Sequence, residues 1–278
     1  MKKKYTIKST HSFFDVKLNE IFSYKDLIIL FIKRDFTVFY KQTILGPAWY
    51  IIQPILYSLV FTVIFGNFAK IPTDGLPPFI FYLSGMVIWG FFSSNLQNSS
   101  NIFNSNKSIF EKVYFPRIIA PISATILSIF QFVIQLIIFL CFYFYFYFNG
   151  SELKISIYIL IVPLLVLQVS FLSIGFGCLI SSLVTKYRDL TFLMGFFIQI
   201  WMYLSPIVYP LSQVPENYKI LYFLNPMVSI IELFKLAFFS ISSINITAII
   251  FSVISTIIIT FLGFVMFIKT EKNFMDTV

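Results

Sequence analysis

Histidine and cysteine are scarce in this chain of 278 residues. There is one histidine, His11, and the two cysteines, Cys141 and Cys178, fall within long apolar runs. The sequence has no CxxC, HExxH or GxxxxGK[ST] pattern, so it offers neither the ligand spacing of a zinc site nor a nucleotide-binding loop. We therefore expect no metal, no cofactor and no catalysis on this chain, and we expect both thiols to be packing residues.

Charged residues are also few, and their distribution predicts the fold class. Only 12% of the residues are charged, 58% are hydrophobic and the mean hydropathy is +0.88. Six intervals contain no Asp, Glu, Lys or Arg: 42–69, 75–106, 118–151, 155–185, 190–215 and 236–268. Each exceeds the roughly 20 residues that a helix needs to cross a membrane. The sequence therefore predicts an all-α polytopic membrane protein whose six transmembrane helices occupy residues 46–268.

The basic residues between these intervals predict the orientation. Sixteen of the 20 Lys and Arg residues fall in one set of segments, and four fall in the alternating set. The first set comprises residues 1–41, 107–117, 186–189 and 269–278. Because basic loops stay in the cytosol, both termini are expected there, with 1–23 as a basic tail and 269–278 as the C-terminus. The net charge of +8 then reflects membrane orientation, and we expect no nucleic-acid binding.

The predicted spans lack ionisable residues, which argues against two classes of membrane protein. Proton-coupled and sodium-coupled carriers usually keep such residues within the membrane. A membrane glycosyltransferase or acyltransferase would place acidic residues or histidine in a cluster at the membrane surface, and the sequence has no such cluster. A lipid-embedded scaffold is still compatible with the spans, so the function has to be inferred from the sequences of the loops.

Residues 24–45 have the pattern of an amphipathic helix that lies on the membrane. Gly46 and Pro47 follow it and predict an elbow before the first span. One stripe of the helix is polar and the opposite side is apolar: Asp26, Lys33, Thr37 and Lys41 against Ile28, Phe31, Ile32, Val38 and Phe39. Asp35 falls within the apolar side, so either it pairs with a basic residue of a neighbour or the helix is rotated from this assignment.

Two loops have mixed polar and apolar character. The cytosolic segment 101–117 predicts a short helix that is either a docking element or a membrane-surface anchor. The outer segment 209–240 predicts two short helices, about 216–224 and 227–239, separated by Asn225 and Pro226. Their position outside the spans is typical of a lid.

Four motifs resemble one known family. They are KRDFTVFYKQTILGPAWYIIQPILYSLVFTVIFG (33–66), FEKVYFPRIIAP (110–121), KYRDL (186–190) and WMYLSPIVYPLSQVP with LNP (201–226). Over residues 24–270 the chain resembles the permease subunit of bacterial type-2 ABC exporters that move O-antigen, teichoic acid or capsule polysaccharide. The resemblance implies a homodimer in the cytoplasmic membrane, joined to two separate ABC ATPase subunits that bind ATP and Mg²⁺. It also implies a lipid-linked polysaccharide as substrate; a type-2 permease for a drug or lipid is the alternative.

The resemblance also suggests roles by position. Residues 24–45 are similar to the family's interface helix, 101–115 to its coupling helix and 216–239 to its outer gate helices. It thereby favours the docking role for the segment 101–117. The expected contacts with the ATPase are Lys107, Phe110, Glu111, Lys112, Lys186, Arg188 and Asp189.

Aromatic residues make up 20% of the sequence, and most of them are expected to face lipid or to fill helix packing. A few can line a glycan pathway, because sugar rings pack their apolar faces on aromatic rings. The candidates are Tyr50, Tyr57, Trp89, Trp201 and Tyr203. Lys33, Arg34 and Lys41 either bind the phosphate headgroup of the substrate or meet anionic membrane lipids.

Overall fold

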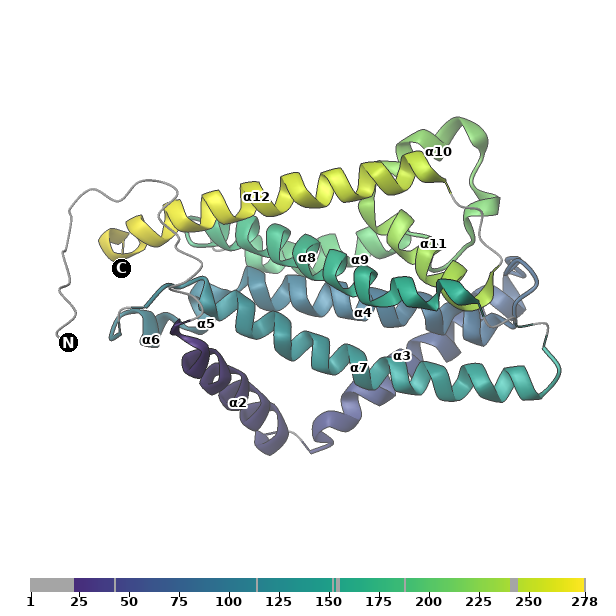
Figure 1. Ribbon diagram of the computed structural model, residues 1–278, viewed down its shortest axis with the longest axis horizontal. Coiled ribbons are helices and arrows are strands. Elements are labelled where there is room, and N and C mark those ends of the chain that lie inside the picture. Colours follow the sequence, from purple (N-terminus) through teal and green to yellow (C-terminus); the bar gives the residue numbers. More distant parts are fainter. Residues whose placement is uncertain are drawn as a thin grey trace.

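The computed structural model describes residues 23–277 except 43, 114, 152, 154–155, 188 and 241–244. The tail 1–22 and Arg188, one of the expected ATPase contacts, therefore lie outside the described residues. The described part contains helices and no strand, which confirms the all-α prediction (Figure 1).

Among the residues that the structure describes, five helical segments are long and apolar enough to cross a membrane. They are Gly46–Phe68, Pro78–Ser100, Ile119–Phe148, Ile157–Val184 and Ile246–Glu271. In order they comprise η1 (Gly46–Ala48), α3 (Trp49–Phe61) and η2 (Thr62–Phe68); α4 (Pro78–Ser100); α7 (Ile119–Phe148); η3 (Ile157–Ile161) and α8 (Val162–Val184); and α12 (Ile246–Thr277). Each lies within one of the predicted charge-free intervals or extends it slightly.

The fifth predicted span, 190–215, is shorter than expected. Its helix, α9, covers Leu190–Tyr203, which is 14 residues or about 21 Å at 1.5 Å per residue. Pro206 and Pro210 follow and prevent the helix from continuing. After η4 (Leu211–Gln213), α10 (Glu216–Phe223) and α11 (Pro226–Phe239) form a pair bent by 102°. By length and composition, the described residues thus contain five helices able to span a membrane, or six if this bent pair counts as one span.

Helix α4 is the centre of the bundle. It packs against α3, α7, α8, α9 and α11. In its apolar stretch 78% of the residues are buried, compared with 17% in the first and last spans. Asn95 of α4 links three helices, because it donates a hydrogen bond to Ser173 at 2.6 Å and accepts one from Thr125 at 2.9 Å. Polar links of this kind help helices associate within a membrane.

Helices α8 and α12 approach each other closely at a glycine. A Cβ atom at Gly175 would lie 2.7 Å from the Cα atom of Thr260, so a larger residue there would force the helices apart. Small residues at helix interfaces are typical of membrane proteins. Figure 1 shows α12 beside α8, with the two helices separating toward α10 and α11.

Helix α2 (Lys25–Gln42) is inclined to the other long helices (Figure 1). After it, Gly46 has a φ of +48°, a conformation that glycine adopts without strain. Asp35 accepts a hydrogen bond from Arg34 Nε at 2.7 Å, so its pairing base is its neighbour in the sequence.

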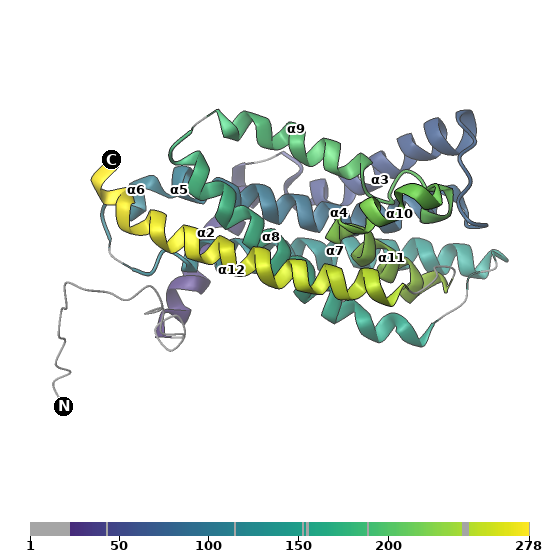
Figure 2. The same ribbon diagram turned by 90° about the horizontal axis from the view of Figure 1, so that it is seen from above.

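The segment predicted as one helix over 101–115 is two short turns, α5 (Ile102–Ser105) and α6 (Lys107–Phe110). They meet at Asn106, whose side-chain amide donates to the carbonyl oxygen of Ile102 at 3.1 Å. Such side-chain hydrogen bonds compete with the helical pattern of the backbone and explain the break. Figures 1 and 2 both place α5 and α6 at one end of the bundle and α10 at the other.

Candidate functional site

A cavity with a volume of about 470 Å³ lies between α3, α4, α7 and α9. Figure 2 shows α3 and α9 on the same side of α4, with α7 on the other side. The lining residues come from all four helices: Tyr50, Gln53, Pro54 and Tyr57 from α3; Met86, Trp89, Gly90, Phe91, Ser93, Ser94, Gln97 and Asn98 from α4; Gln131, Phe132 and Gln135 from α7; Gly195, Ile198, Gln199 and Met202 from α9.

Side-chain amides dominate the polar part of this lining, and none of the lining residues carries a charge. The amides are Gln53, Gln97, Asn98, Gln131, Gln135 and Gln199. Gln131 is held on both sides, because its Nε2 donates to the Tyr50 hydroxyl at 2.6 Å and its Oε1 accepts from Ser94 at 3.1 Å. An amide offers both donors and an acceptor, so this wall can bind a neutral ligand that is rich in hydroxyl groups.

Three of the expected pathway aromatics line the cavity: Tyr50, Tyr57 and Trp89. Tyr57 is half exposed on α3, whereas Trp89 is buried and supports the wall from α4. Tyr50 acts through its hydroxyl, which accepts the hydrogen bond from Gln131.

The other two expected aromatics do not line it. The Trp201 ring lies behind the wall, with its centroid 4.9 Å from Phe92 and 6.4 Å from Trp89. Its Nε1 donates to Asn225 Oδ1 at 2.9 Å, and the same oxygen accepts from the backbone N–H of Met227 at the start of α11. Trp201 therefore connects the cavity wall to the cap of α11. Tyr203 is 43% exposed and lies outside the lining.

The sequence analysis missed the amide side chains. A usable signal was present, because Gln131 and Gln135 are four residues apart within an otherwise apolar run and therefore share one face of a helix. Polar residues are costly inside a membrane unless they are paired or face a cavity.

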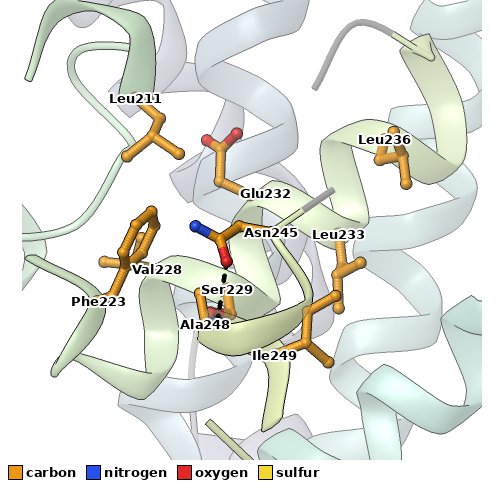
Figure 3. Close-up of a pocket in the computed structure, with 10 residues that line it drawn as sticks. All are labelled: Leu211, Phe223, Val228, Ser229, Glu232, Leu233, Leu236, Asn245, Ala248 and Ile249. Carbon is orange, nitrogen blue, oxygen red and sulfur yellow. Dashed lines mark hydrogen bonds between the residues drawn. The ribbon is translucent and has the colours of Figure 1, made fainter. Parts of the chain in front are cut away.

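A second, much smaller pocket of about 20 Å³ lies between α10, α11 and the start of α12 (Figure 3). Its volume has room for about one water molecule and none for a sugar ring. Asn245 points into this region, but its Oδ1 accepts from the backbone N–H of Ala248 at 3.2 Å and so caps α12. The large cavity is therefore the better candidate for a binding site.

The expected ATPase contacts gather at the opposite end from α10. Five of them are exposed: Lys107, Glu111, Lys112, Lys186 and Asp189. Phe110 differs from these five, because it is only 1% exposed and packs against Phe103, Phe115 and the guanidinium of Arg117. Its ring supports the segment from within the chain and presents no surface to a partner.

The three basic residues expected at a headgroup differ in their surroundings. Lys33 and Lys41 are exposed on α2. Arg34 is half-buried, donates to Asp35 and to Asn106 Oδ1 at 2.9 Å, and lies 4.5 Å from the centre of the Phe31 ring. The guanidinium therefore joins α2 to the break between α5 and α6.

Comparison with known proteins decides the family. The ABC-2 type transporter family model matches residues 26–239, which is most of the chain. The chain belongs to the ABC-2 type transporter family. The matched region contains the whole lining of the cavity, both turns of the α5–α6 segment and the bent pair α10–α11. The family expected from the four sequence motifs is thus confirmed.

Relatives of this ABC-2 permease include proteins with transport functions in their names. "O-antigen export system permease protein RfbA" of Klebsiella pneumoniae is 25% identical over 254 residues, covering 90% of this chain and 94% of the relative. The Myxococcus xanthus protein of the same name is 22% identical over 225 residues, covering 80% and 84%. "Polysialic acid transport protein KpsM" of Escherichia coli is 23% identical over 192 residues, covering 68% and 72%.

Proposed function

We propose that this ABC-2 permease exports a lipid-linked polysaccharide across the bacterial cytoplasmic membrane, driven by ATP hydrolysis on a separate ABC ATPase. The observation that carries the proposal is the neutral cavity lined by six amide side chains together with Tyr50, Tyr57 and Trp89. The names of the O-antigen and polysialic acid relatives support the same substrate class.

The lining suits a chain that has to slide. Sugar hydroxyl groups exchange hydrogen bonds with amide groups, and the apolar face of a sugar ring packs on an aromatic ring. Each contact is weak on its own, so a glycan can be retained without being trapped. Charged groups would bind more strongly and resist movement.

The working unit in this proposal is a homodimer. Helices α3 and α9 border the cavity on the same side of α4 and expose large apolar side chains, including Tyr57, Phe192 and Phe196. A second copy against this side would enclose the cavity as a pathway and cover the exposed rings. The bent pair α10–α11 would form the outer gate of that pathway.

The end that carries α5 and α6 is the cytosolic end in this proposal, as the distribution of basic residues requires. Both termini then lie in the cytosol. The ATPase, with its bound ATP and Mg²⁺, would dock on the exposed residues Lys107, Glu111, Lys112, Lys186 and Asp189. Arg188, which lies outside the described residues, belongs to the same proposed contact by its position in the sequence.

The phosphate headgroup of the carrier lipid would meet Lys33 and Lys41, which are exposed on α2. Arg34 contributes less directly, since its guanidinium already binds Asp35 and Asn106 within the chain. Anionic membrane lipids compete for the same two lysines.

Gene deletion and complementation in the source bacterium test this function. Without the gene, we expect the surface polysaccharide to be lost and a lipid-linked glycan to accumulate inside the cell; the wild-type gene should restore export. Tyr57→Ala should restore it poorly, whereas Tyr145→Ala, which changes another exposed tyrosine that lies outside the cavity, should restore it fully. Normal surface polysaccharide in the deletion strain would contradict the proposal and leave a drug or lipid as the substrate.

A further inference from the structure

Gln135 stands out among the amides of the cavity. Its side chain is buried, with 9% of its surface exposed, and it lines the cavity from α7. Within the described part of the chain, its Oε1 has no hydrogen-bond partner. The oxygen itself is fully buried and lies close to Gly90 of α4, so the amide has to rotate to turn it into the cavity. Buried polar atoms in proteins are nearly always paired, so an unpaired acceptor on a cavity-lining side chain favours this rotation when a ligand offers a donor.

The contrast with Gln131, one helical turn away, sharpens this point. Both polar groups of Gln131 are bonded within the chain, to Tyr50 and Ser94. Gln131 therefore acts as a fixed part of the wall. The acceptor of Gln135, on the same face of α7, has no partner among the described residues.

Gly90 makes the space for the Gln135 amide. A Cβ atom at Gly90 would lie 3.2 Å from Gln135 Oε1 and 3.7 Å from its Nε2. Any larger residue at Gly90 would press on the amide and shift its position slightly. Trp89, the neighbour of Gly90, supplies an aromatic ring to the same lining.

We propose that Gln135 Oε1 accepts a hydrogen bond from a sugar hydroxyl of the transported glycan and so sets the affinity for the substrate. The inference rests on the proposed function, because it requires a hydroxyl-rich ligand in the cavity. It assigns Gln135 a specificity role, in which ligands without a donor at this position bind more weakly. The donor that completes the site belongs to the substrate.

The test uses the permease with its ABC ATPase in nanodiscs, titrated with the lipid-linked glycan that accumulates in cells lacking the permease. ATP hydrolysis is measured against glycan concentration. If the wild-type complex shows no stimulation, the proposed function fails whatever Gln135 does. If it is stimulated, the half-maximal concentration reports on Gln135.

Two substitutions at Gln135 separate the acceptor from the volume it occupies. Gln135→Met keeps the length of the side chain and removes the acceptor, so it should raise the half-maximal concentration about tenfold, the effect of losing one hydrogen bond to a ligand. Gln135→Glu keeps an oxygen acceptor in either protonation state and should stay within about threefold of the wild type.

Gln168→Met is the matched control, because Gln168 lies in α8 outside the cavity and bonds to Ser252. It should leave the half-maximal concentration unchanged. Gly90→Ala is the second probe, which alters the position of the Gln135 amide without altering its chemistry, and it should raise the half-maximal concentration about threefold.

An unchanged half-maximal concentration in Gln135→Met would overturn the proposal and indicate that only water meets this acceptor. An equal loss in the Met and Glu variants would also overturn it, because the acceptor would then not be what matters. If Gln135→Met does not assemble, Gly90→Ala provides the test. An unchanged half-maximal concentration in Gly90→Ala would contradict the role of Gln135.

Discussion

Lys235 of α11 donates a hydrogen bond from Nζ to the carbonyl oxygen of Pro206, at 2.6 Å. The lysine is only 5% exposed, and its Nζ lies 3.8 Å from the centre of the Phe81 ring and 3.8 Å from Glu232 Oε1. Phe81 belongs to α4 and Pro206 to the turn after α9. Lys235 therefore fastens the bent helix pair to the centre of the bundle.

Lys235→Met should destabilise the protein. Methionine keeps the apolar stem but removes the donor to Pro206 and the charge over Phe81. A hydrogen bond from a charged group contributes about 1.5–3 kcal/mol, so we expect a loss of that size in the free energy of unfolding in detergent, with a lower thermal midpoint.

Lys219→Met is the control for that variant. Lys219 pairs with Glu216 at the surface of α10, and such pairs contribute about 0–1 kcal/mol. Equal thermal midpoints for the two variants would show that Lys235 does not hold the helix pair in place.

Labelling with an impermeant maleimide checks the orientation. In a variant whose Cys141 and Cys178 are replaced by alanine, a cysteine at Glu216 should react in intact cells and a cysteine at Lys107 should not, since basic segments stay in the cytosol. The reverse pattern would invert the bundle and move the proposed ATPase contact to the other face of the membrane.

Glu111→Lys should weaken binding of the ABC ATPase without affecting folding. Glu111 is exposed on the α5–α6 segment and pairs only loosely with Lys107, at 3.8 Å. Reversal of an interface charge typically costs several kcal/mol in binding, so co-purification of the ATPase should be lost. Glu216→Lys is the same reversal at the other end of the bundle, and it should retain the ATPase. Normal co-purification with Glu111→Lys would remove this segment from the proposed contact.

Substitutions of the basic residues of α2 should have two different effects, one on lipid binding and one on thermal stability. Lys33→Gln with Lys41→Gln should reduce binding to anionic lipid, by about 1 kcal/mol per residue, with little change in thermal stability. Arg34→Gln should instead lower the thermal midpoint, because it removes the bonds to Asp35 and Asn106. If the double lysine variant also binds the lipid-linked glycan more weakly, the headgroup role of these lysines is supported. Unchanged stability in Arg34→Gln would contradict the structural role of Arg34.

The spans could be predicted from the sequence because a membrane leaves so few choices. Charges are costly in lipid and backbone groups must be satisfied within a helix, so a long charge-free run has to be helical. The break at Asn225 and Pro226 was equally readable, since Pro has no N–H and begins a helix well. The length of α9 was harder to predict, because the charge-free interval 190–215 continues past Pro206 and Pro210, which end the helix.

The cavity could be predicted only in part. Residues 50, 57 and 89 were predicted to line the pathway because they are aromatic, but Trp201 is also aromatic and lies behind the wall. The difference depends on how α4 and α9 pack, which periodicity within one helix does not reveal. Lys235 was assigned to an outer loop for the same reason, although it is buried against α4.

The most direct test of the central claim is ATP-driven transport by the purified complex. Proteoliposomes would contain the permease with its ABC ATPase facing outward, and the lipid-linked glycan from permease-deficient cells in the outer leaflet. An endoglycosidase added outside measures how much glycan is still accessible. We expect ATP to make the glycan progressively resistant to the enzyme, and we expect no change without ATP or with the permease alone. If the glycan stays accessible while the complex hydrolyses ATP, this permease does not export a lipid-linked polysaccharide.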